Sequence, residues 1–212
     1  MAAPSTRRSP LRNRVTPLGD LVAIPLRGSW LGNRGSLHEG TDIVRFHRSS
    51  LWIICALQHK DWRLPQWSEG HFTVLFFHDE AVALAAGHRP CALCRRDDYN
   101  RYRRAVADGT GGRLPWAKEI DRQLHGERIV RGTHRRRLHP MYWPSVPDGT
   151  FVQLDGTPAL ALADRLVRWT ADGYGPTVAR PATGQAAVIT PPSSAAAIRA
   201  GYLPQIDGSA LA

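Results

Sequence analysis

Apolar and polar positions divide this chain into a strand-rich start, a helical middle and a second strand-rich region. Short apolar runs broken by turn residues occupy 15–30, 43–46 and 51–57, and six apolar or β-favouring residues in a row follow at 72–77. Runs of this length, bounded by Gly, Pro and polar residues, predict β-strands. We expect the strands at 43–46 and 51–57 to pair as a hairpin, and the glycine-rich segment 32–40 to form a loop.

The hydrophobic period becomes helical after the last of these strands. Residues 79–86 are rich in alanine and are followed by Gly87, a pattern typical of a helix with a glycine stop. A second helix is expected over 97–107, and a third begins at 116 and ends between 124 and 128. The glycine-rich stretch 108–112 separates these two helices as a linker.

Short strands separated by Gly and Pro turns return in the last third of the chain. The expected strands and the closing helix span 151–154, 159–162, 166–169, 187–190 and 194–200. These patterns predict an α+β protein, in which a small strand/helix module with a basic helical extension is followed by a small β-rich domain. The predicted parts are a flexible basic arm at 1–14, a domain at 15–138 and a β-rich domain at 139–212.

Composition places the chain among globular proteins that do not span a membrane. An apolar content of 42% and seven tryptophans in 212 residues suffice for a buried core. The sequence has no run of about 18 apolar residues, which argues against a transmembrane helix, and its start lacks the apolar segment of a secretory signal. Three cysteines, two of them at metal-binding spacing, fit a reducing compartment better than a disulfide scaffold, so we expect a cytoplasmic protein.

Positive charge is concentrated in one part of the chain. The formal net charge is +10, and residues 89–137 carry 14 Arg or Lys against 6 Asp or Glu. Such a surface attracts a polyanion, so we expect a nucleic-acid partner, DNA above all. The alternative is a solvated, arginine-rich helix in a protein from a GC-rich genome. The arginines expected to contact phosphates are Arg95, Arg96, Arg101, Arg103, Arg104, Arg135, Arg136 and Arg137.

Two cysteines with the spacing of a zinc knuckle follow the first predicted helix. Cys91 and Cys94 stand at C-x-x-C spacing, so both thiolates can reach one tetrahedral Zn²⁺. Two buried structural thiols are the alternative. The third cysteine, Cys55, lies within the apolar strand at 51–57, where an inert core thiol is the ordinary expectation.

The order of these features resembles one known family. An apolar strand, an alanine-rich helix and the motif Gly-x-Arg-Pro-Cys-x-x-Cys at 87–94 are similar to the metal-binding N-terminal domain of the bacterial Ada-type DNA repair proteins, over residues 51–104. In that family four cysteines hold zinc, and the first accepts a methyl group from a methylated DNA phosphate. The resemblance implies that Cys55, Cys91 and Cys94 bind Zn²⁺. It also implies that Cys55 is the catalytic nucleophile of an alkyl-phosphotriester repair protein.

The fourth zinc ligand departs from the family. His59 follows Cys55 at the family's spacing but stands where the family has a cysteine. A neutral imidazole in place of a thiolate makes the site less negative and the remaining thiolates poorer methyl acceptors, which favours metal binding over methyl transfer. The alternatives are His38 on the glycine-rich loop, His88 beside the knuckle, and water or substrate. We therefore expect a zinc-stabilised, nucleic-acid-binding protein.

A second candidate centre lies on the third predicted helix. Asp121 and His125 stand four residues apart and share one helix face. A histidine oriented by a carboxylate beside arginines suits phosphodiester hydrolysis, whereas a surface polar pair is the commoner arrangement. An alternative function is therefore a nuclease or related hydrolase centred on His125. A non-catalytic adaptor that binds a protein partner through the nearly neutral domain at 139–212 is the remaining alternative.

Overall fold

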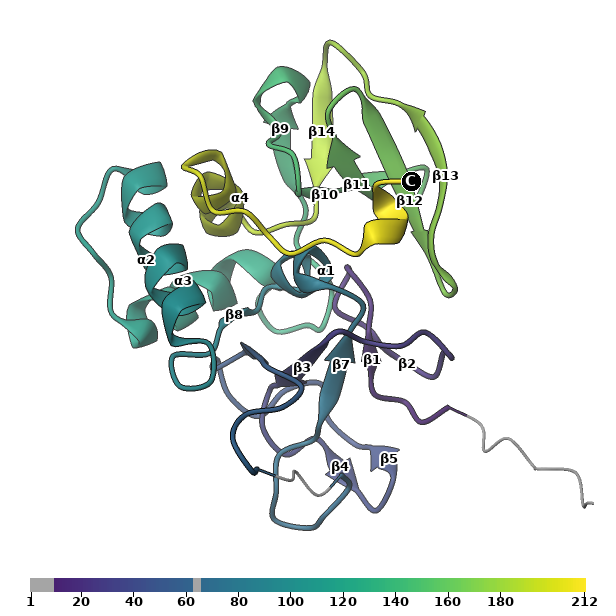
Figure 1. The fold of residues 1–212 in the computed structure, drawn as a ribbon, viewed down its shortest axis with the longest axis vertical. Helices are drawn as coiled ribbons and strands as arrows, with labels where there is room; N and C mark the ends of the chain where they lie inside the picture. Colours follow the sequence, from purple (N-terminus) through teal and green to yellow (C-terminus); the bar gives the residue numbers. More distant parts are fainter. Residues whose placement is uncertain (1–9, 63–65) are drawn as a thin grey trace, which may run out of the picture.

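Two six-stranded β-sheets joined by helices form the fold (Figure 1). The computed structural model describes residues 10–62 and 66–212. This part of the chain has a mixed α+β structure, as the sequence pattern predicts. Within these ranges no helix has the length and the apolarity that crossing a bilayer requires.

The first sheet collects the strands of the amino-terminal region. In spatial order its strands are β2 (Leu21–Val22), β1 (Arg14–Val15), β7 (Leu75–Phe77), β3 (Trp30–Asn33), β6 (Ile53–Cys55) and β8 (Arg89–Pro90). β1 is parallel to β7 and β6 is parallel to β8, whereas the other neighbours are antiparallel. β8 is an edge strand, which is where a sheet tolerates a proline such as Pro90.

The hairpin predicted from 43–46 and 51–57 is wrong. β5 (Asp42–Ile43) pairs instead with β4 (His38–Glu39), and β6 lies between β3 and β8. The side chains of Trp52 and Ile54 are fully buried. A strand with this much apolar surface gains more from a position inside the sheet than from a surface hairpin.

The described part of the predicted basic arm is attached to the first sheet. Residues 1–9 lie outside the described residues. The Nε of Arg12 donates to the carbonyl of Leu21 at 2.8 Å. Arg14 belongs to β1, and its Nε donates to the carbonyl of Leu26 at 2.7 Å.

The second sheet is antiparallel throughout. In spatial order its strands are β13 (Gly173–Ala179), β12 (Arg165–Thr170), β11 (Thr157–Leu162), β10 (Phe151–Leu154), β14 (Gln185–Val188) and β9 (His139–Tyr142). The strands predicted at 151–154, 159–162 and 166–169 are confirmed. The pattern did not predict β13, because Gly173 and Pro176 indicate a turn. β13 lies at the sheet edge, where these residues cost little ladder hydrogen bonding.

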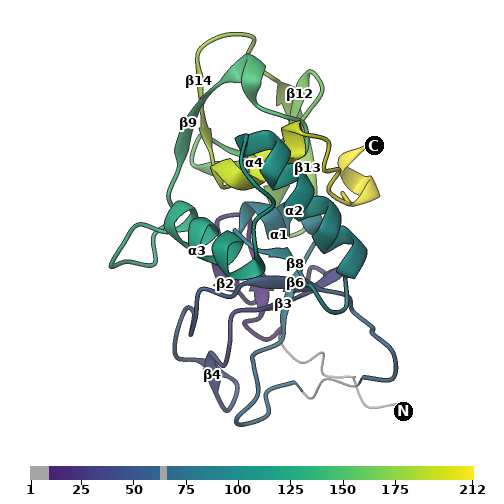
Figure 2. The ribbon, with the colours of Figure 1, turned by 90° about the vertical axis from the view of Figure 1, so that its left-hand side faces the viewer.

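Helices lie between and beside the two sheets. They are α1 (Glu80–Ala85), α2 (Arg96–Thr110), α3 (Ala117–Arg128) and α4 (Pro192–Arg199), with 3₁₀ turns η1 (Trp143–Ser145) and η2 (Gly208–Ala210). α1 is buried along its whole length and contacts β7 of the first sheet and β10 of the second. α2 packs on α4, and Figure 2 shows α2, α3 and α4 grouped in front of α1. The sequence predicts all four helices to within a few residues.

One buried core crosses the boundary predicted between residues 138 and 139. It contains Phe77 and Leu84 from the amino-terminal part, and Phe151, Trp169 and Tyr202 from the carboxy-terminal part. The helix α1 lies within this core. The two sheets therefore bury their apolar faces in a common interior.

Two carboxylates at the start of α1 connect the same two parts. Asp79 caps the helix by accepting from the N–H of Val82 at 2.8 Å, and it also accepts from the hydroxyl of Tyr174 at 2.7 Å. Glu80 accepts from the hydroxyl of Tyr202 at 2.6 Å. These hydrogen bonds from tyrosine hydroxyls to buried carboxylates fix the position of the carboxy-terminal part of the chain relative to α1.

Candidate metal centre and basic surface

Three cysteine thiols meet at the edge of the first sheet. The Sγ atoms of Cys55, Cys91 and Cys94 all lie within 4.8 Å of one another. All three are free thiols rather than disulfide partners. Among the described residues, these side chains form the cluster that could hold a metal ion.

Strand pairing brings the cysteines together. Cys55 is the last residue of β6, and Cys91 directly follows the parallel strand β8. The N–H of Cys91 donates to the carbonyl of Ile54 at 2.9 Å, which places the two strand ends side by side. The following turn returns Cys94 to the same place, and the N–H of Leu93 donates to the Cys91 sulfur at 3.4 Å. A backbone donor to sulfur favours the thiolate, which is the form that binds metals.

The three thiols shift one another's pKa. Hydrogen bonding with Cys91 and Cys94, and then burial, raises the pKa of Cys55. Hydrogen bonds from Cys55 and Cys94 lower the pKa of Cys91. The three thiols therefore share hydrogen bonds and do not lose their protons independently of one another. A metal ion that displaces these protons converts all three sulfurs to thiolates.

The donor set fits a tetrahedral thiolate site. With a Zn–S bond of about 2.3 Å, two sulfurs on one ion lie about 3.8 Å apart, so the present sulfurs need only a small approach. Three thiolates leave one coordination position. Beside the sulfurs lies a cavity of about 160 Å³, lined mainly by apolar side chains that include Ile53, Leu57 and Phe72.

The structure separates the histidines considered for the fourth position. His59 lines the same cavity as the three cysteines, but its ring nitrogens do not lie within the cluster of their sulfurs. His38 is buried in β4, where its Nδ1 lies 2.6 Å from the hydroxyl of Thr73, so this alternative ligand is not part of the cluster. His88 is also engaged elsewhere, because its Nε2 accepts from the Nε of Arg34 at 3.1 Å.

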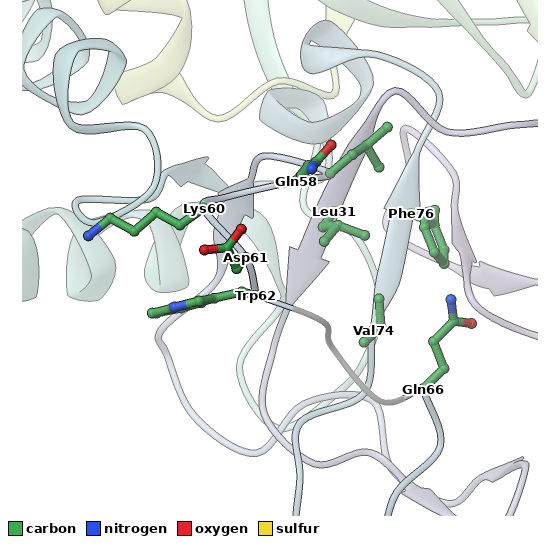
Figure 3. Close-up of a pocket in the computed structure, with 9 residues that line it drawn as sticks. Leu31, Gln58, Lys60, Asp61, Trp62, Gln66, Val74 and Phe76 are labelled. Carbon is green, nitrogen blue, oxygen red and sulfur yellow. The ribbon is translucent and has the colours of Figure 1, made fainter.

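A second cavity adjoins the one beside the cysteines and shares Leu57 and Trp62 with it. Its volume is about 510 Å³. Figure 3 shows its apolar side chains Leu31, Val74 and Phe76, and its polar side chains Gln58, Lys60, Asp61 and Gln66. One ammonium, one carboxylate and two amides form a mixed set that selects no single class of ligand.

Arg95 does not belong to a phosphate-binding surface. Its guanidinium is buried and ion-paired with Glu80 at 2.8 Å and with Asp98 at 2.7 Å. It also lies over the ring of Trp30, 3.8 Å from the centroid. A guanidinium enclosed by two carboxylates and an aromatic ring is not available to a phosphate, so the contact predicted at Arg95 is wrong.

Arg136 also points into the protein. It donates to the carbonyl of Arg128 at 3.1 Å and to the carbonyl of Ile189 at 2.6 Å. Its neighbours Arg135 and Arg137 are exposed. The phosphate contact predicted at Arg136 is therefore wrong, because this side chain satisfies backbone carbonyls that would otherwise be buried without donors.

The other predicted phosphate contacts lie nearer the surface. The exposed ones are Arg96, Arg101, Arg104, Arg135 and Arg137. Arg101 also forms an ion pair with Asp98. Arg103 is half-buried, and its Nε donates to the carbonyl of Pro115 at 3.0 Å. The basic surface of the described chain is thus smaller than the sequence suggests.

Asp121 and His125 do not form a pair. The carboxylate of Asp121 accepts two hydrogen bonds from the buried guanidinium of Arg89, at 2.8 and 2.9 Å. The Nδ1 of His125 accepts instead from Arg128 at 2.9 Å. Helical spacing places both residues on one face, but Asp121 is the ion-pair partner of the buried guanidinium of Arg89 and is therefore not available to His125. The predicted orientation of His125 by Asp121 is wrong.

Three histidines that are distant in the sequence gather beside α3. The rings of His47 and His125 pack edge-on with centroids 5.1 Å apart, and His134 lies 6.2 Å from His47. They line a cavity of about 650 Å³ together with Arg122 and Arg137. Sequence reasoning missed His47, because no local spacing relates it to α3. The one available signal was the accumulation of His and Arg after His125.

Comparisons with family models, curated proteins and solved structures found no match to this chain. The similarity to the Ada-type family over residues 51–104 therefore stays a prediction from the motif at 87–94. The cytoplasmic location and a protein partner for the carboxy-terminal region also stay predictions.

Proposed function

We propose that this protein binds zinc through Cys55, Cys91 and Cys94, and binds nucleic acid, DNA above all, through arginines beside that site. The observation that supports the proposal is the convergence of three free thiols within 4.8 Å of one another. The helix α2, which carries exposed arginines, begins two residues after Cys94. The metal thus organises the element that meets the polyanion.

Zinc suits this donor set better than a hard cation does. Thiolates are soft ligands that select zinc over magnesium or calcium, which prefer oxygen. Zinc joins the end of β6 to the turn that follows β8, and so fixes the start of α2. We assign the fourth position to His59, which lines the same cavity although its ring is not within the cluster of sulfurs.

The exposed arginines of α2 share one side of the helix. At 3.6 residues per turn, Arg96, Arg101 and Arg104 fall within an arc of about 140°. Guanidinium groups bind phosphates in a bidentate manner and release counterions, which gives salt-dependent binding with little sequence preference. Because Arg101 is paired with Asp98, we assign the principal contacts to Arg96 and Arg104.

Metal analysis tests the zinc site. We expect one zinc per chain in the wild type, loss of zinc in Cys55→Ser and Cys91→Ser, and weaker retention in His59→Ala. His71→Ala is the matched control, because His71 is exposed and does not line the cavity of the cysteines. Metal-free wild-type protein with three titratable thiols would refute the site.

Fluorescence anisotropy with duplex DNA and with the matching RNA tests the partner. We expect affinity to fall steeply between about 50 and 200 mM salt, and the slope of log affinity against log salt to decrease by about 2 in a double Arg96→Ala, Arg104→Ala variant. Arg27→Ala serves as the control, since Arg27 is exposed outside α2. Affinity that does not respond to salt would contradict nucleic-acid binding.

Methyl transfer to Cys55 is a second candidate function, favoured by the apolar cavity that Cys55 lines. The thiolate attacks the methyl carbon of a methyl phosphotriester, the S–C bond forms, the C–O bond breaks and the phosphodiester leaves as an anion. Incubation with methylphosphotriester DNA should add one methyl mass to the peptide that contains Cys55, and none in Cys55→Ser. Unmodified Cys55 in zinc-loaded protein would eliminate this function.

A further inference from the structure

A basic cavity lies against α3, the loop after it and the segment that leads into β6. Its volume is about 650 Å³. Three histidines and three arginines dominate its lining: His47, His125, His134, Arg122, Arg131 and Arg137. Of the described residues that line it, none carries a carboxylate. The cavity therefore presents hydrogen-bond donors and positive charge without an internal counter-ion.

Buried arginines add to the positive potential of this cavity. Arg128 contacts His125 at 2.9 Å, and burial together with Arg136 lowers the pKa of Arg128 to about 9. Burial, followed by His125 and Arg128, lowers the pKa of His47 to about 4. These groups oppose one another's positive charge, and a bound anion would relieve that repulsion.

The protonation of His125 is set by its neighbour. Because Arg128 donates to the Nδ1 of His125, this ring carries its proton on Nε2 and can act only as a donor there. The Nδ1 of His47 is buried and has no hydrogen-bond partner among the described residues. Imidazole N–H groups and guanidinium forks are donors that phosphate oxygens accept.

The loop that walls the cavity is held by its own backbone. Ile129 and Arg136 form a bridge, and the N–H of Val130 donates to the carbonyl of Arg135 at 3.0 Å. Gly132 turns the loop with a φ of 77°, and a Cβ placed there would meet nothing within 4 Å. The wall is therefore ordered by hydrogen bonds while the space beside Gly132 stays open.

We propose that this cavity binds a phosphate monoester group. Several convergent donors without a carboxylate suit the dianion of a monoester better than the single charge of an internal phosphodiester. A volume of about 650 Å³ also leaves room for an attached nucleoside. The end of a nucleic-acid strand and a free nucleotide both present this group. This site rests on the proposed nucleic-acid binding only if its ligand is the phosphorylated end of a strand. Binding of a free nucleotide does not depend on that function.

The test compares two oligonucleotides of one sequence that differ only in a 5′-phosphate, with adenosine monophosphate and inorganic phosphate as further ligands. We expect the phosphorylated strand to bind at least about tenfold more tightly, since only this strand offers a terminal phosphate to the charge-assisted donors of the cavity. Arg131→Ala and Arg137→Ala change exposed residues and should abolish this preference without unfolding the protein. Arg104→Ala, on α2, should weaken both strands equally.

The possible outcomes distinguish a failure of the phosphate site in the cavity from a failure of nucleic-acid binding. Equal binding of the two strands, with no binding of adenosine monophosphate or phosphate, overturns the site. A preference that survives in both Arg131→Ala and Arg137→Ala also overturns it, because the phosphate would then bind elsewhere. Adenosine monophosphate that binds the wild type but not Arg137→Ala supports the cavity even where neither strand binds. If neither strand binds in that case, the nucleic-acid-binding function is refuted and the phosphate site in the cavity is retained.

Discussion

Replacing Arg95 with methionine tests whether this arginine is structural. The Nη2 of Arg95 lies 2.8 Å from Glu80, and the two side chains are 2% and 1% exposed. Burial alone would lower the pKa of Arg95, but Glu80 and Tyr202 raise it, so the guanidinium stays charged. Methionine keeps much of the packing on Trp30 and removes the charge. The Glu80 carboxylate is then buried without this cation.

The size of the expected loss of unfolding free energy in Arg95→Met depends on the hydrogen bonds that the Glu80 carboxylate keeps. Removing one partner of a buried ion pair costs about 3–5 kcal/mol. The carboxylate of Glu80 still accepts from the hydroxyl of Tyr202 at 2.6 Å and from the N–H of Gln205 at 3.0 Å, which favours the lower end of that range. With a urea m value of about 2 kcal/mol per molar, a loss of about 3 kcal/mol lowers the unfolding midpoint by about 1.5 M. Tryptophan fluorescence measures this shift.

Arg96 supplies the matched control, because it is the next residue and is exposed. Arg96→Met should change the free energy of unfolding by less than about 0.5 kcal/mol while weakening DNA binding. Combining Arg95→Met with Glu80→Gln should cost less than the sum of the two single changes, since the buried charge is removed with its partner. A loss below about 1 kcal/mol for Arg95→Met, or strict additivity, would refute the buried pair.

Three further predictions concern the metal, a buried histidine and a glycine. Chelation of zinc should lower the melting temperature of the wild type but not of Cys91→Ser, as calorimetry can measure; equal effects would contradict the site. Burial, then Arg34, lowers the pKa of His88 well below its ordinary 6.5. The unfolded chain therefore binds more protons below pH 6.5, and this residue should cost about 1.4 kcal/mol of stability per pH unit on acidification, a slope that urea titrations should find reduced in His88→Gln. Gly87→Ala should cost at least about 1–2 kcal/mol, because φ is +82° and the new Cβ would lie 2.6 Å from Cδ of Arg128; unchanged urea unfolding would refute this.

The part of the cysteine cluster whose members are close in the sequence could be predicted. The spacing of Cys91 and Cys94 keeps both sulfurs in one neighbourhood in any fold that turns there. Cys55 entered only through the family resemblance, because its approach depends on the parallel pairing of β6 with β8. Pairing between strands that are distant in the sequence leaves no local signal, which is also why the predicted hairpin at 43–46 and 51–57 was wrong.

The roles of the arginines could not be predicted from charge alone. Arg95 and Arg96 are adjacent and chemically identical, yet one is buried against Glu80 and the other is exposed. Arg89 finds its carboxylate in Asp121, on a helix that begins after a glycine-rich linker. Composition counts positive charges, but only the tertiary structure determines which of them are neutralised within the protein and which face a ligand.

Residues 47–55 contribute to both proposed sites, because Cys55 belongs to the metal centre and His47 lines the basic cavity. Trp52, which lies between them, explains how the basic cavity keeps its positive potential. Cys55 ends β6, and Trp52 immediately precedes the strand. The guanidinium groups of Arg34 and Arg128 lie 4.0 and 3.8 Å from the centroid of the Trp52 ring. A desolvated cation–π contact contributes about 2 kcal/mol, so an indole can hold a buried guanidinium where other cations take a carboxylate. Arg128 is held by an aromatic ring and by backbone carbonyls, and it forms no ion pair within the described residues, so its buried charge adds to the positive potential beside His125 that an anion in the cavity would meet.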